Sequence, residues 1–267
     1  MKTKLLFLFF LPMISFAQVN ANFEGVVGID FSNAACHYVD MNTTSAHMLV
    51  NYSNSCGTVV VTESSADPNL GYITTLDPNT ANGPAGFSDG DYFGVANASS
   101  VASQLGAAPP EGTQAFLMED TDGTVAMIFD KVFLEGTVNP QVSLQYILDD
   151  TGWELEDFLK ITVEISGCST NQITLLDTTG SDIDALGIEN SWNTLSADLS
   201  GYVGVGCAAQ LIIEFSSNSA SEELGIDNII FTKGTTVEPA LSNETFNLDN
   251  AFTVFPNPSN GNITIKN

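Results

Sequence analysis

Hydrophobic and polar residues alternate with a period of two along much of the chain. In Gln141–Leu148 every second residue is apolar, and residues 159–165 alternate in the same way. Such alternation is typical of β-strands with one buried face. The same pattern, bounded by Gly, Pro, Asn, Asp or Ser, predicts further strands at residues 58–63, 113–119, 124–133, 172–177, 211–215 and 224–231.

A helical turn fits only two short stretches, residues 98–106 and 181–187. Many short strands separated by turn residues predict an all-β fold, a two-sheet jelly-roll sandwich over residues 18–233. Residues 234–250 contain Pro239 and few periodic apolar positions, so we expect a flexible linker there. Residues 251–267 resume strand-like alternation around a Pro-rich turn and predict a hairpin.

Residues 1–17 have the composition of a secretory signal peptide. Two lysines precede an apolar run that starts at Leu5, and the small residues Ser15 and Ala17 precede the expected cleavage site. The run is shorter than the roughly 20 apolar residues that span a membrane. We therefore expect a secreted protein with no stable membrane span once the leader is removed.

The charge balance excludes several classes of partner. The chain carries 32 acidic residues against 6 basic ones, for a net charge of −26, and its basic residues are all lysines. Nucleic acids and anionic lipid surfaces are bound through clustered Lys and Arg, so neither is an expected partner. Phosphorylated substrates are disfavoured too, because no arginine is present to grip a phosphate.

Four cysteines in an exported chain predict two disulfides. Three pairings are open. We favour Cys36 with Cys56 and Cys168 with Cys207, because each pair closes a loop within one region. Zinc is a weaker alternative, since no C-x-x-C pair is present, and His37 is interpreted as a loop histidine.

The excess of carboxylates favours calcium, which binds six to eight oxygen ligands. The candidate ligands are Glu24, Asp89, Asp91, Glu223 and Asp227. Asp227 lies on an apolar strand, so its carboxylate needs either a metal or backbone donors, unless it caps a turn or faces solvent. The segment 119–123 (EDTDG) lacks the final glutamate of a helix-loop-helix calcium loop. It is interpreted as a hairpin turn with Gly123 at positive φ.

The segment 153–157 (WELED) has an enzymatic and a binding interpretation. Glu154 and Glu156 would share one strand face and resemble part of the E-x-D-x-x-E arrangement of jelly-roll glucanases, but no second glutamate follows at that spacing. Catalysis is therefore disfavoured. Aromatic rings that stack on sugars are the other interpretation, and packing in the core is the alternative to it. The candidate rings are Trp153, Tyr92 and Trp192, followed by Tyr72 and Tyr202.

The last residues resemble the opening of the type A C-terminal sorting domain of the type IX secretion system. The motif FPNPSNG carries the resemblance, with Phe255, Pro256, Asn257, Pro258 and Gly261 as its marked positions. Only the start of that small β domain is expected within residues 251–267. The resemblance implies a passage through the periplasm, contact with the secretion machinery, and a secreted or outer-surface location.

Residues 23–231 are similar, more loosely, to secreted jelly-roll modules of the MAM-like and carbohydrate-binding kind. The similarity rests on residues 23–25, 88–94, 153–157 and 221–229 together with Trp192. It implies a structural calcium between an acid of the first strand and one of the last, here Glu24 and Asp227. A binding or adhesion module, with a glycan as the first ligand class to consider, is the favoured function. The alternatives are a glycan hydrolase using Glu154 or Glu156 and a non-catalytic module of a larger secreted enzyme.

Overall fold

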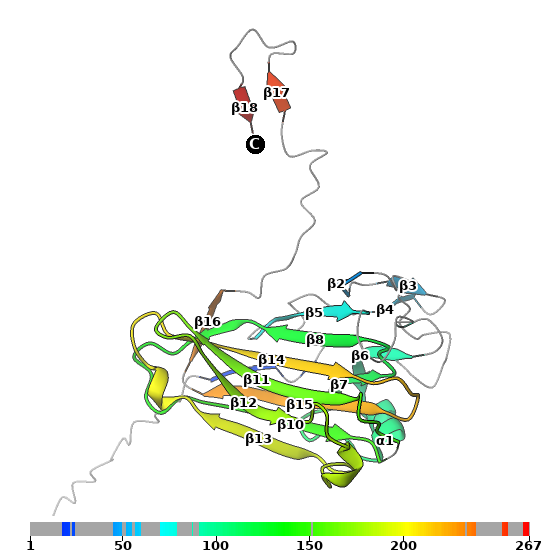
Figure 1. The fold of residues 1–267 in the computed structure, drawn as a ribbon. Helices are drawn as coiled ribbons and strands as arrows, with labels where there is room; N and C mark the ends of the chain where they lie inside the picture. Colours follow the sequence, from blue (N-terminus) through cyan, green and yellow to red (C-terminus); the bar gives the residue numbers. More distant parts are fainter. Residues whose placement is uncertain are drawn as a thin grey trace, which may run out of the picture.

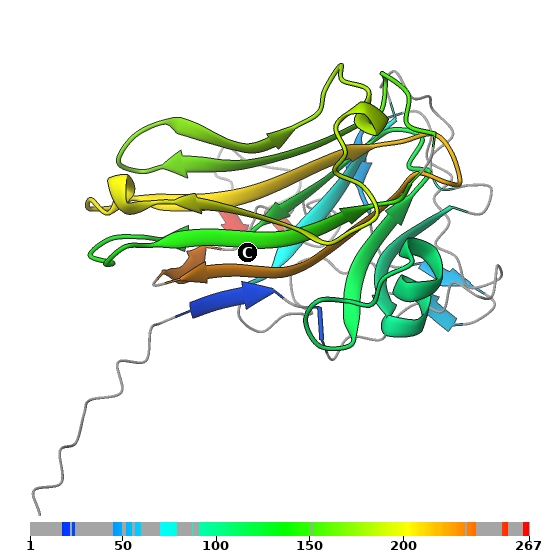
Figure 2. The ribbon, with the colours of Figure 1, turned by 90° about the horizontal axis from the view of Figure 1, so that it is seen from below.

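A computed structural model describes residues 18–21, 23–24, 45–49, 52–54, 57–59, 70–78, 87, 91–150, 152–232, 234–238, 253–255 and 264–266. These residues form mainly strands, most of which assemble into two antiparallel sheets packed face to face (Figures 1 and 2), while β3 (Tyr52–Asn54) and β4 (Gly57–Val59) form a separate pair. The predicted all-β sandwich is confirmed.

The first sheet has β15 at its centre. Across the sheet the strands follow the order β13 (Asn193–Asp198), β10 (Gln141–Leu148), β15 (Glu223–Thr232), β7 (Gln114–Glu119) and β6 (Tyr92–Asn97). The short β1 (Gln18–Ala21) also pairs with β15, and its residues 18–21 lie opposite residues 229–232. β7 pairs with residues 223–226 of the same strand. β1 and β7 therefore lie one after the other beside β15.

The second sheet is built around β14. Its strand order is β12 (Asn171–Asp177), β11 (Phe158–Ser166), β14 (Ala208–Ser216), β8 (Thr124–Phe129), β5 (Tyr72–Asp77) and β2 (His47–Met48). β9 (Lys131–Phe133) also pairs with β14, and β16 (Thr235–Glu238) pairs with β9. The predicted strand 124–133 is thus divided at Asp130, which accepts a hydrogen bond from the backbone N–H of Gly71 through Oδ2 (2.9 Å).

Aromatic residues from both sheets meet in the core. Phe116 of β7 packs edge-on against Tyr72 of β5, with ring centroids 5.8 Å apart, and against Phe93 of β6 at 4.8 Å. Phe23, which follows β1, contacts the same Tyr72 and Phe116 rings. Such edge-to-face pairs contribute about 0.5–1.5 kcal/mol each beyond the area that they bury. The inward-facing residues of the alternating strands therefore join the two sheets.

The single α-helix of the described residues, α1 (Ala98–Leu105), lies within the first of the two stretches for which a helical turn was predicted. Asn97 caps it by accepting a hydrogen bond from the backbone N–H of Ser100 (3.0 Å), and Gly106 ends it at φ 66°. The second predicted stretch contains the 3-10 turn η2 (Ile183–Ala185). A second such turn, η3 (Ser200–Tyr202), was not predicted.

The predicted hairpin at residues 119–123 is wrong. β7 belongs to the first sheet and β8 to the second, so this segment crosses between sheets. Positive φ is adopted by Asp120 (48°) and Asp122 (45°), whereas Gly123 is not among the positive-φ residues. A Cβ added at Gly123 would lie 2.8 Å from the backbone oxygen of Asp77. Glycine is required here by the close approach of another strand.

The two ends of the sandwich have different loops. Loops 120–123, 149–157, 178–192 and 217–222, which we call the acidic end, each connect one sheet to the other. Loops 134–140, 167–170 and 199–207, which we call the disulfide end, lie at the opposite ends of the same strands. There Cys168 and Cys207 form the expected disulfide. The other expected pair, Cys36 and Cys56, lies outside the described residues, as do residues 1–17.

The expected C-terminal hairpin is present as two paired strands. β17 (Thr253–Phe255) and β18 (Thr264–Lys266) are antiparallel, with Val254 opposite Ile265. The turn that contains Pro256, Asn257, Pro258 and Gly261 lies outside the described residues. Within the parts of the chain that are described, no helix is both long and apolar enough to cross a membrane.

Candidate functional site

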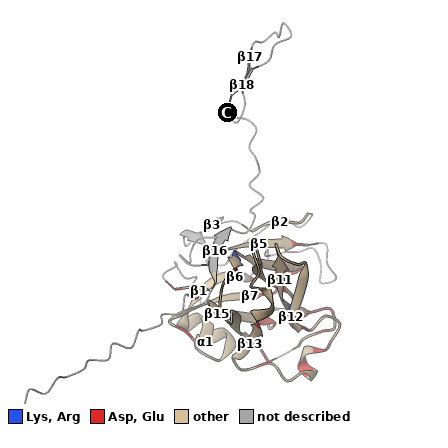
Figure 3. Cartoon of the chain, turned by 90° about the vertical axis from the view of Figure 1, so that its left-hand side faces the viewer, with Lys and Arg blue, Asp and Glu red and all other residues tan. Residues whose placement is uncertain are grey.

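Carboxylates gather at the acidic end without basic neighbours in the same loops. Figure 3 shows red acidic segments at several loops and little blue. At the disulfide end the loops contain a single acidic residue, Glu135. The acidic end has these acidic residues: Asp120, Asp122, Asp149, Asp150, Glu154, Glu156, Asp157, Asp182, Asp184, Glu189 and Glu222. Such a concentration of one charge attracts cations.

Asp227 lies at the point where β1 ends and β7 begins beside β15. It is fully buried, and its Oδ2 accepts a hydrogen bond from the backbone N–H of Glu111 (3.1 Å), while Oδ1 accepts one from Asn228 (2.7 Å). Glu24, just after β1, accepts hydrogen bonds from the backbone N–H groups of Thr113 and Gln114. The backbone donors that were one alternative predicted for Asp227 are therefore present.

The same place collects three carboxylates. Burial raises the pKa of Asp227 to about 7, and repulsion from Glu111 and Glu24 adds to the increase, whereas the two backbone N–H donors oppose it. Glu111 Oε2 is buried and has no hydrogen-bond partner. Glu24, Glu111 and Asp227 therefore offer converging negative oxygens next to backbone donors that neutralise only part of their charge.

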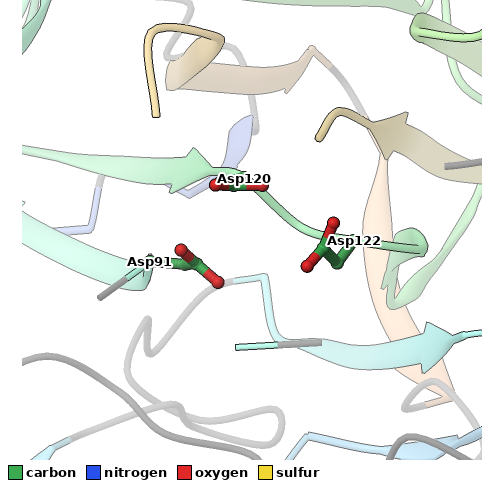
Figure 4. Close-up of side chains that lie close together, drawn as sticks. All are labelled: Asp91, Asp120 and Asp122. Carbon is green, nitrogen blue, oxygen red and sulfur yellow. The ribbon is translucent and has the colours of Figure 1, made fainter. Parts of the chain in front are cut away.

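A second group consists of Asp91, Asp120 and Asp122. Each offers a carboxylate oxygen within 4.8 Å of the others. Figure 4 shows Asp91 at the start of β6 and the other two on the segment that crosses from β7 to β8. The buried Thr121 fixes this segment, because its Oγ1 accepts a hydrogen bond from the backbone N–H of Ser217 (3.1 Å). Aspartate tolerates the positive φ that the crossing requires.

A third group lies across three strands of the first sheet. Tyr92, Glu119 and Glu223 occupy one row on β6, β7 and β15, and the Tyr92 hydroxyl donates a hydrogen bond to Glu223 Oε1 (2.8 Å). The pKa of Glu119 and of Glu223 is raised to about 8, mainly by burial and in part by the nearby carboxylate of Asp149, while the Tyr92 hydroxyl acts to lower that of Glu223. At neutral pH in the absence of cations, this row favours protonated carboxyls.

A fourth group connects two loops of the acidic end. Glu154 and Asp157 lie in loop 149–157 and Glu222 in loop 217–222, with one carboxylate oxygen of each within 4.8 Å of the others. Asp157 and Glu222 are fully buried. The pKa of Glu222 is raised to about 8, mainly by burial and in part by the carboxylates of Asp157 and Glu154, while the backbone N–H of Asn218 acts to lower it.

The five candidate calcium ligands are not one site. Glu223 and Asp227 are four residues apart on one strand, which is about 13 Å. Asp91 groups with residues of the crossing segment, and Asp89 lies outside the described residues. Only Glu24 and Asp227 lie together as predicted. Glu111, Asp120, Asp122, Asp157 and Glu222 were missed, because their groups combine loops that are distant in sequence.

The paired-carboxylate interpretation of Glu154 and Glu156 is not supported. These residues lie in a turn, closed by a hydrogen bond from the Asp157 N–H to the Glu154 carbonyl oxygen (3.2 Å), and not on one strand face. Glu154 is grouped instead with the buried Asp157 and Glu222. Asp157 and Glu222 are fully buried, so exposed Glu154 lacks the second accessible carboxyl that glycoside hydrolysis needs, and hydrolysis by this group is not proposed.

Two of the three candidate stacking rings belong to the core. Trp153 is 4% exposed, packs edge-on against Phe215 at 6.1 Å and donates a hydrogen bond to the Asp149 carbonyl oxygen. Tyr92 is 1% exposed, and Tyr72 is buried as well. The packing alternative is therefore correct for these rings, since no face is free for a sugar.

Trp192 differs from these rings because it is only half-buried. Its Nε1 donates a hydrogen bond to the Ala108 carbonyl oxygen (2.8 Å). A Cβ added at Gly225 would lie 3.1 Å from the Trp192 ring and 2.6 Å from Leu105 of α1. The missing side chain at Gly225 therefore lets the ring lie over the sheet with part of its surface in solvent. Tyr202 is half-buried too.

Comparison with known proteins gave structural likenesses only: no family model matches the chain, and no curated protein matches it. Among solved structures, the chain is similar to the K2 cleaved adhesin domain of Lys-gingipain, with a TM-score of 0.40 and 14% identity over 81% of this chain and 99% of that one. It is also similar to TmCBM61 in complex with β-1,4-galactotriose, with a TM-score of 0.34 and 16% identity over 52% of this chain and 80% of that one. A third likeness is to the CBM22-1–GH10 modules of Clostridium thermocellum xylanase 10B. Its TM-score is 0.33, with 16% identity over 57% of this chain and 26% of that one. Likenesses of this size carry no argument about ligand or mechanism.

Proposed function

We propose that this chain is an exported binding module that holds a glycan outside the cell. The single observation that carries the proposal is Trp192, a half-buried indole at the acidic end with its ring edge fixed over Gly225. Beside it Asn193 and Asn190 place amide groups, which donate hydrogen bonds to the Ile188 carbonyl oxygen and to Asp150. A fixed aromatic face with amides and carboxylates around it is the chemistry that binds sugar rings and hydroxyls.

Trp192 also gives the test. In a glycan microarray with the full chain, Trp192→Ala is expected to lower the affinity for the bound glycan about tenfold, since an aromatic contact contributes up to about 1.5 kcal/mol. Trp192→Phe keeps an aromatic face and removes the Nε1 donor, so it should retain most of the binding. Equal binding by the wild type and Trp192→Ala, or no glycan bound by the wild type, would reject the glycan proposal.

Calcium is proposed as a structural ion held by Glu24, Glu111 and Asp227. The residues fit an oxygen-preferring ion, because Glu111 Oε2 is buried without a partner and all three groups are carboxylates. When bound, the ion would neutralise repulsion between the chain leaving β1 and the chain entering β7. Excess EDTA is then expected to lower the thermal midpoint of the wild type by more than it lowers that of Asp227→Asn.

The proposed route is export through the periplasm to the outer surface by type IX secretion. It is supported by the composition of residues 1–17 and by the FPNPSNG motif, whose flanking strands β17 and β18 pair as a hairpin. Deleting residues 251–267 in the native host is expected to move the protein from the surface or medium into the periplasm. Unchanged surface delivery of the deletion variant would contradict this route.

A further inference from the structure

The loops 149–157 and 217–222 lie against each other at the acidic end. Trp153 of the first loop packs on Phe215, at the end of β14 that leads into the second. A Cβ added at Gly152 would lie 3.9 Å from Ser221 Oγ. The two loops belong to different crossings between the sheets, so whatever joins them also fixes the sheets relative to each other at this end.

The carboxylate of Glu222, between these loops, is only partly satisfied by hydrogen bonds. Asp157 Oδ2 accepts a hydrogen bond from the Glu154 backbone N–H (2.6 Å), and Glu222 Oε2 accepts one from the Asn218 backbone N–H (2.9 Å). The second oxygen of Glu222, Oε1, is buried and has no hydrogen-bond partner. A buried carboxylate oxygen without a partner is strongly destabilising.

A basic side chain does not provide the missing partner. Within the described residues the closest lysine in sequence, Lys160, forms an ion pair with Glu214 (3.3 Å), and Lys131 lies on β9, which pairs with residues 208–209 toward the disulfide end. A proton or a metal ion is left as the neutralising group. A proton neutralises one carboxyl, whereas three carboxylates with oxygens within 4.8 Å of one another provide the charge and ligand type for a divalent cation.

We propose that Glu154, Asp157 and Glu222 form a second cation site, selective for a divalent, oxygen-preferring ion of the Ca²⁺ type. Asp157 and Glu222 supply buried oxygens, and Glu154, which is exposed, is the ligand on the solvent side through which the ion enters. Water completes the coordination. The bound ion joins loop 149–157 to loop 217–222. This site is separate from the one proposed at Glu24, Glu111 and Asp227 and does not rest on it.

The loop contains its own optical probe and its own control. Trp153 precedes Glu154 in sequence and transfers excitation to Tb³⁺, a luminescent substitute for Ca²⁺. Glu156 lies in the same turn, is exposed, and is not among the grouped ligands. Glu156→Gln therefore removes the same charge from the same loop without removing a ligand.

The test is a titration of the chelator-treated full chain with Tb³⁺ and with Ca²⁺. We expect Trp-sensitised Tb³⁺ emission that Ca²⁺ abolishes. In Glu154→Gln the affinity for Tb³⁺ and Ca²⁺ should fall by about tenfold or more, since affinity follows the number of charged ligands. Glu156→Gln should bind as the wild type does, and Asp227→Asn should keep the Trp-sensitised signal while it loses the calcium effect at the other site. Glu154 is exposed, so its variant is expected to fold.

Two results would overturn the proposal. One is equal ion affinity in Glu154→Gln and Glu156→Gln. The other combines two observations: the wild type gives no Trp-sensitised emission, and Glu222→Gln in EDTA is as stable as the wild type in Ca²⁺. That result would mean that a shared proton, and not a metal ion, neutralises the group. If EDTA destabilises Asp227→Asn as much as it destabilises the wild type, the calcium site at Glu24, Glu111 and Asp227 is rejected, and the site at Glu154, Asp157 and Glu222 is unaffected.

Discussion

The two ends of the sandwich hold their loops in different ways. At the disulfide end, Cys168 and Cys207 are joined covalently, and the Leu134 N–H donates a hydrogen bond to the Cys207 carbonyl oxygen (2.9 Å). At the acidic end, buried carboxylates from different loops face one another. Covalent and backbone contacts do not depend on ions, whereas packed carboxylates need protons or cations. One protein therefore combines an end that is stable in any ionic medium with one whose order is conditional.

The largest expected effect that separates the two ends is the pH dependence of stability without divalent ions. Burial raises the folded-state pKa of Glu119 and Glu223 to about 8, above the unfolded value of about 4.3. The folded state then holds extra protons, so this contribution to stability is complete below about pH 4 and is lost as the pH rises toward 8. The loss is about 1.4 kcal/mol per pH unit for each group.

Urea unfolding in EDTA at pH 5 and at pH 8 measures this loss. The free energy of unfolding should be lower at pH 8, and Glu119→Gln should flatten the dependence because the amide does not titrate. A free energy that is the same at both pH values would show that these carboxyls have ordinary pKa values in the folded protein.

The next effect concerns the disulfide end. The bond between Cys168 and Cys207 closes a loop with a sequence separation of 39 residues, and chain-entropy arguments assign about 4 kcal/mol to such a loop. The double variant Cys168→Ser/Cys207→Ser should lose about that much unfolding free energy at pH 5 and at pH 8 alike. A loss confined to pH 8 would mean that the two ends are coupled, contrary to the comparison drawn above.

A smaller effect tests the tight crossing at the acidic end. In Gly123→Ala the new methyl group would meet the Asp77 carbonyl oxygen at 2.8 Å, so we expect a destabilisation of about 1–3 kcal/mol. Gly201, at the disulfide end, has no atom within 4 Å of the corresponding position and is the matched control. Thermal melts of both variants make the comparison, and equal midpoints would indicate that the crossing relaxes without loss.

Local sequence patterns predicted most strands, the helix and the Cys168–Cys207 disulfide of this fold well. The segment Gln141–Leu148 alternates as far as Tyr146 and is β10 with the same bounds, and α1 lies within the predicted stretch because Asn97 and Gly106 are good helix caps. Cys168 and Cys207 each flank a strand, and these strands, β11 and β14, are neighbours. In these cases the deciding interactions lie close together in the sequence or follow from chain order.

The sites were harder to predict, for two physical reasons. Alternation shows which face of a strand is buried but not which sheet it joins, so residues 119–123 were interpreted as a hairpin although β7 and β8 lie in different sheets. The burial of Trp153 depends on Phe215, a contact across 62 positions that no local pattern encodes. The group that contains Glu154 and Glu222 also depends on contacts between residues that are distant in the sequence.

The direction of β15 determines how the module is displayed. Its ten residues run from Glu223, next to the acidic loops, to Thr232, opposite Gln18 of β1, and β16 begins three residues later. A fully extended strand of that length measures about 33 Å. A tether attached beyond Glu238 therefore pulls on the edge formed by β16 and β9, while loops 149–157 and 217–222 lie at the opposite end of the strands.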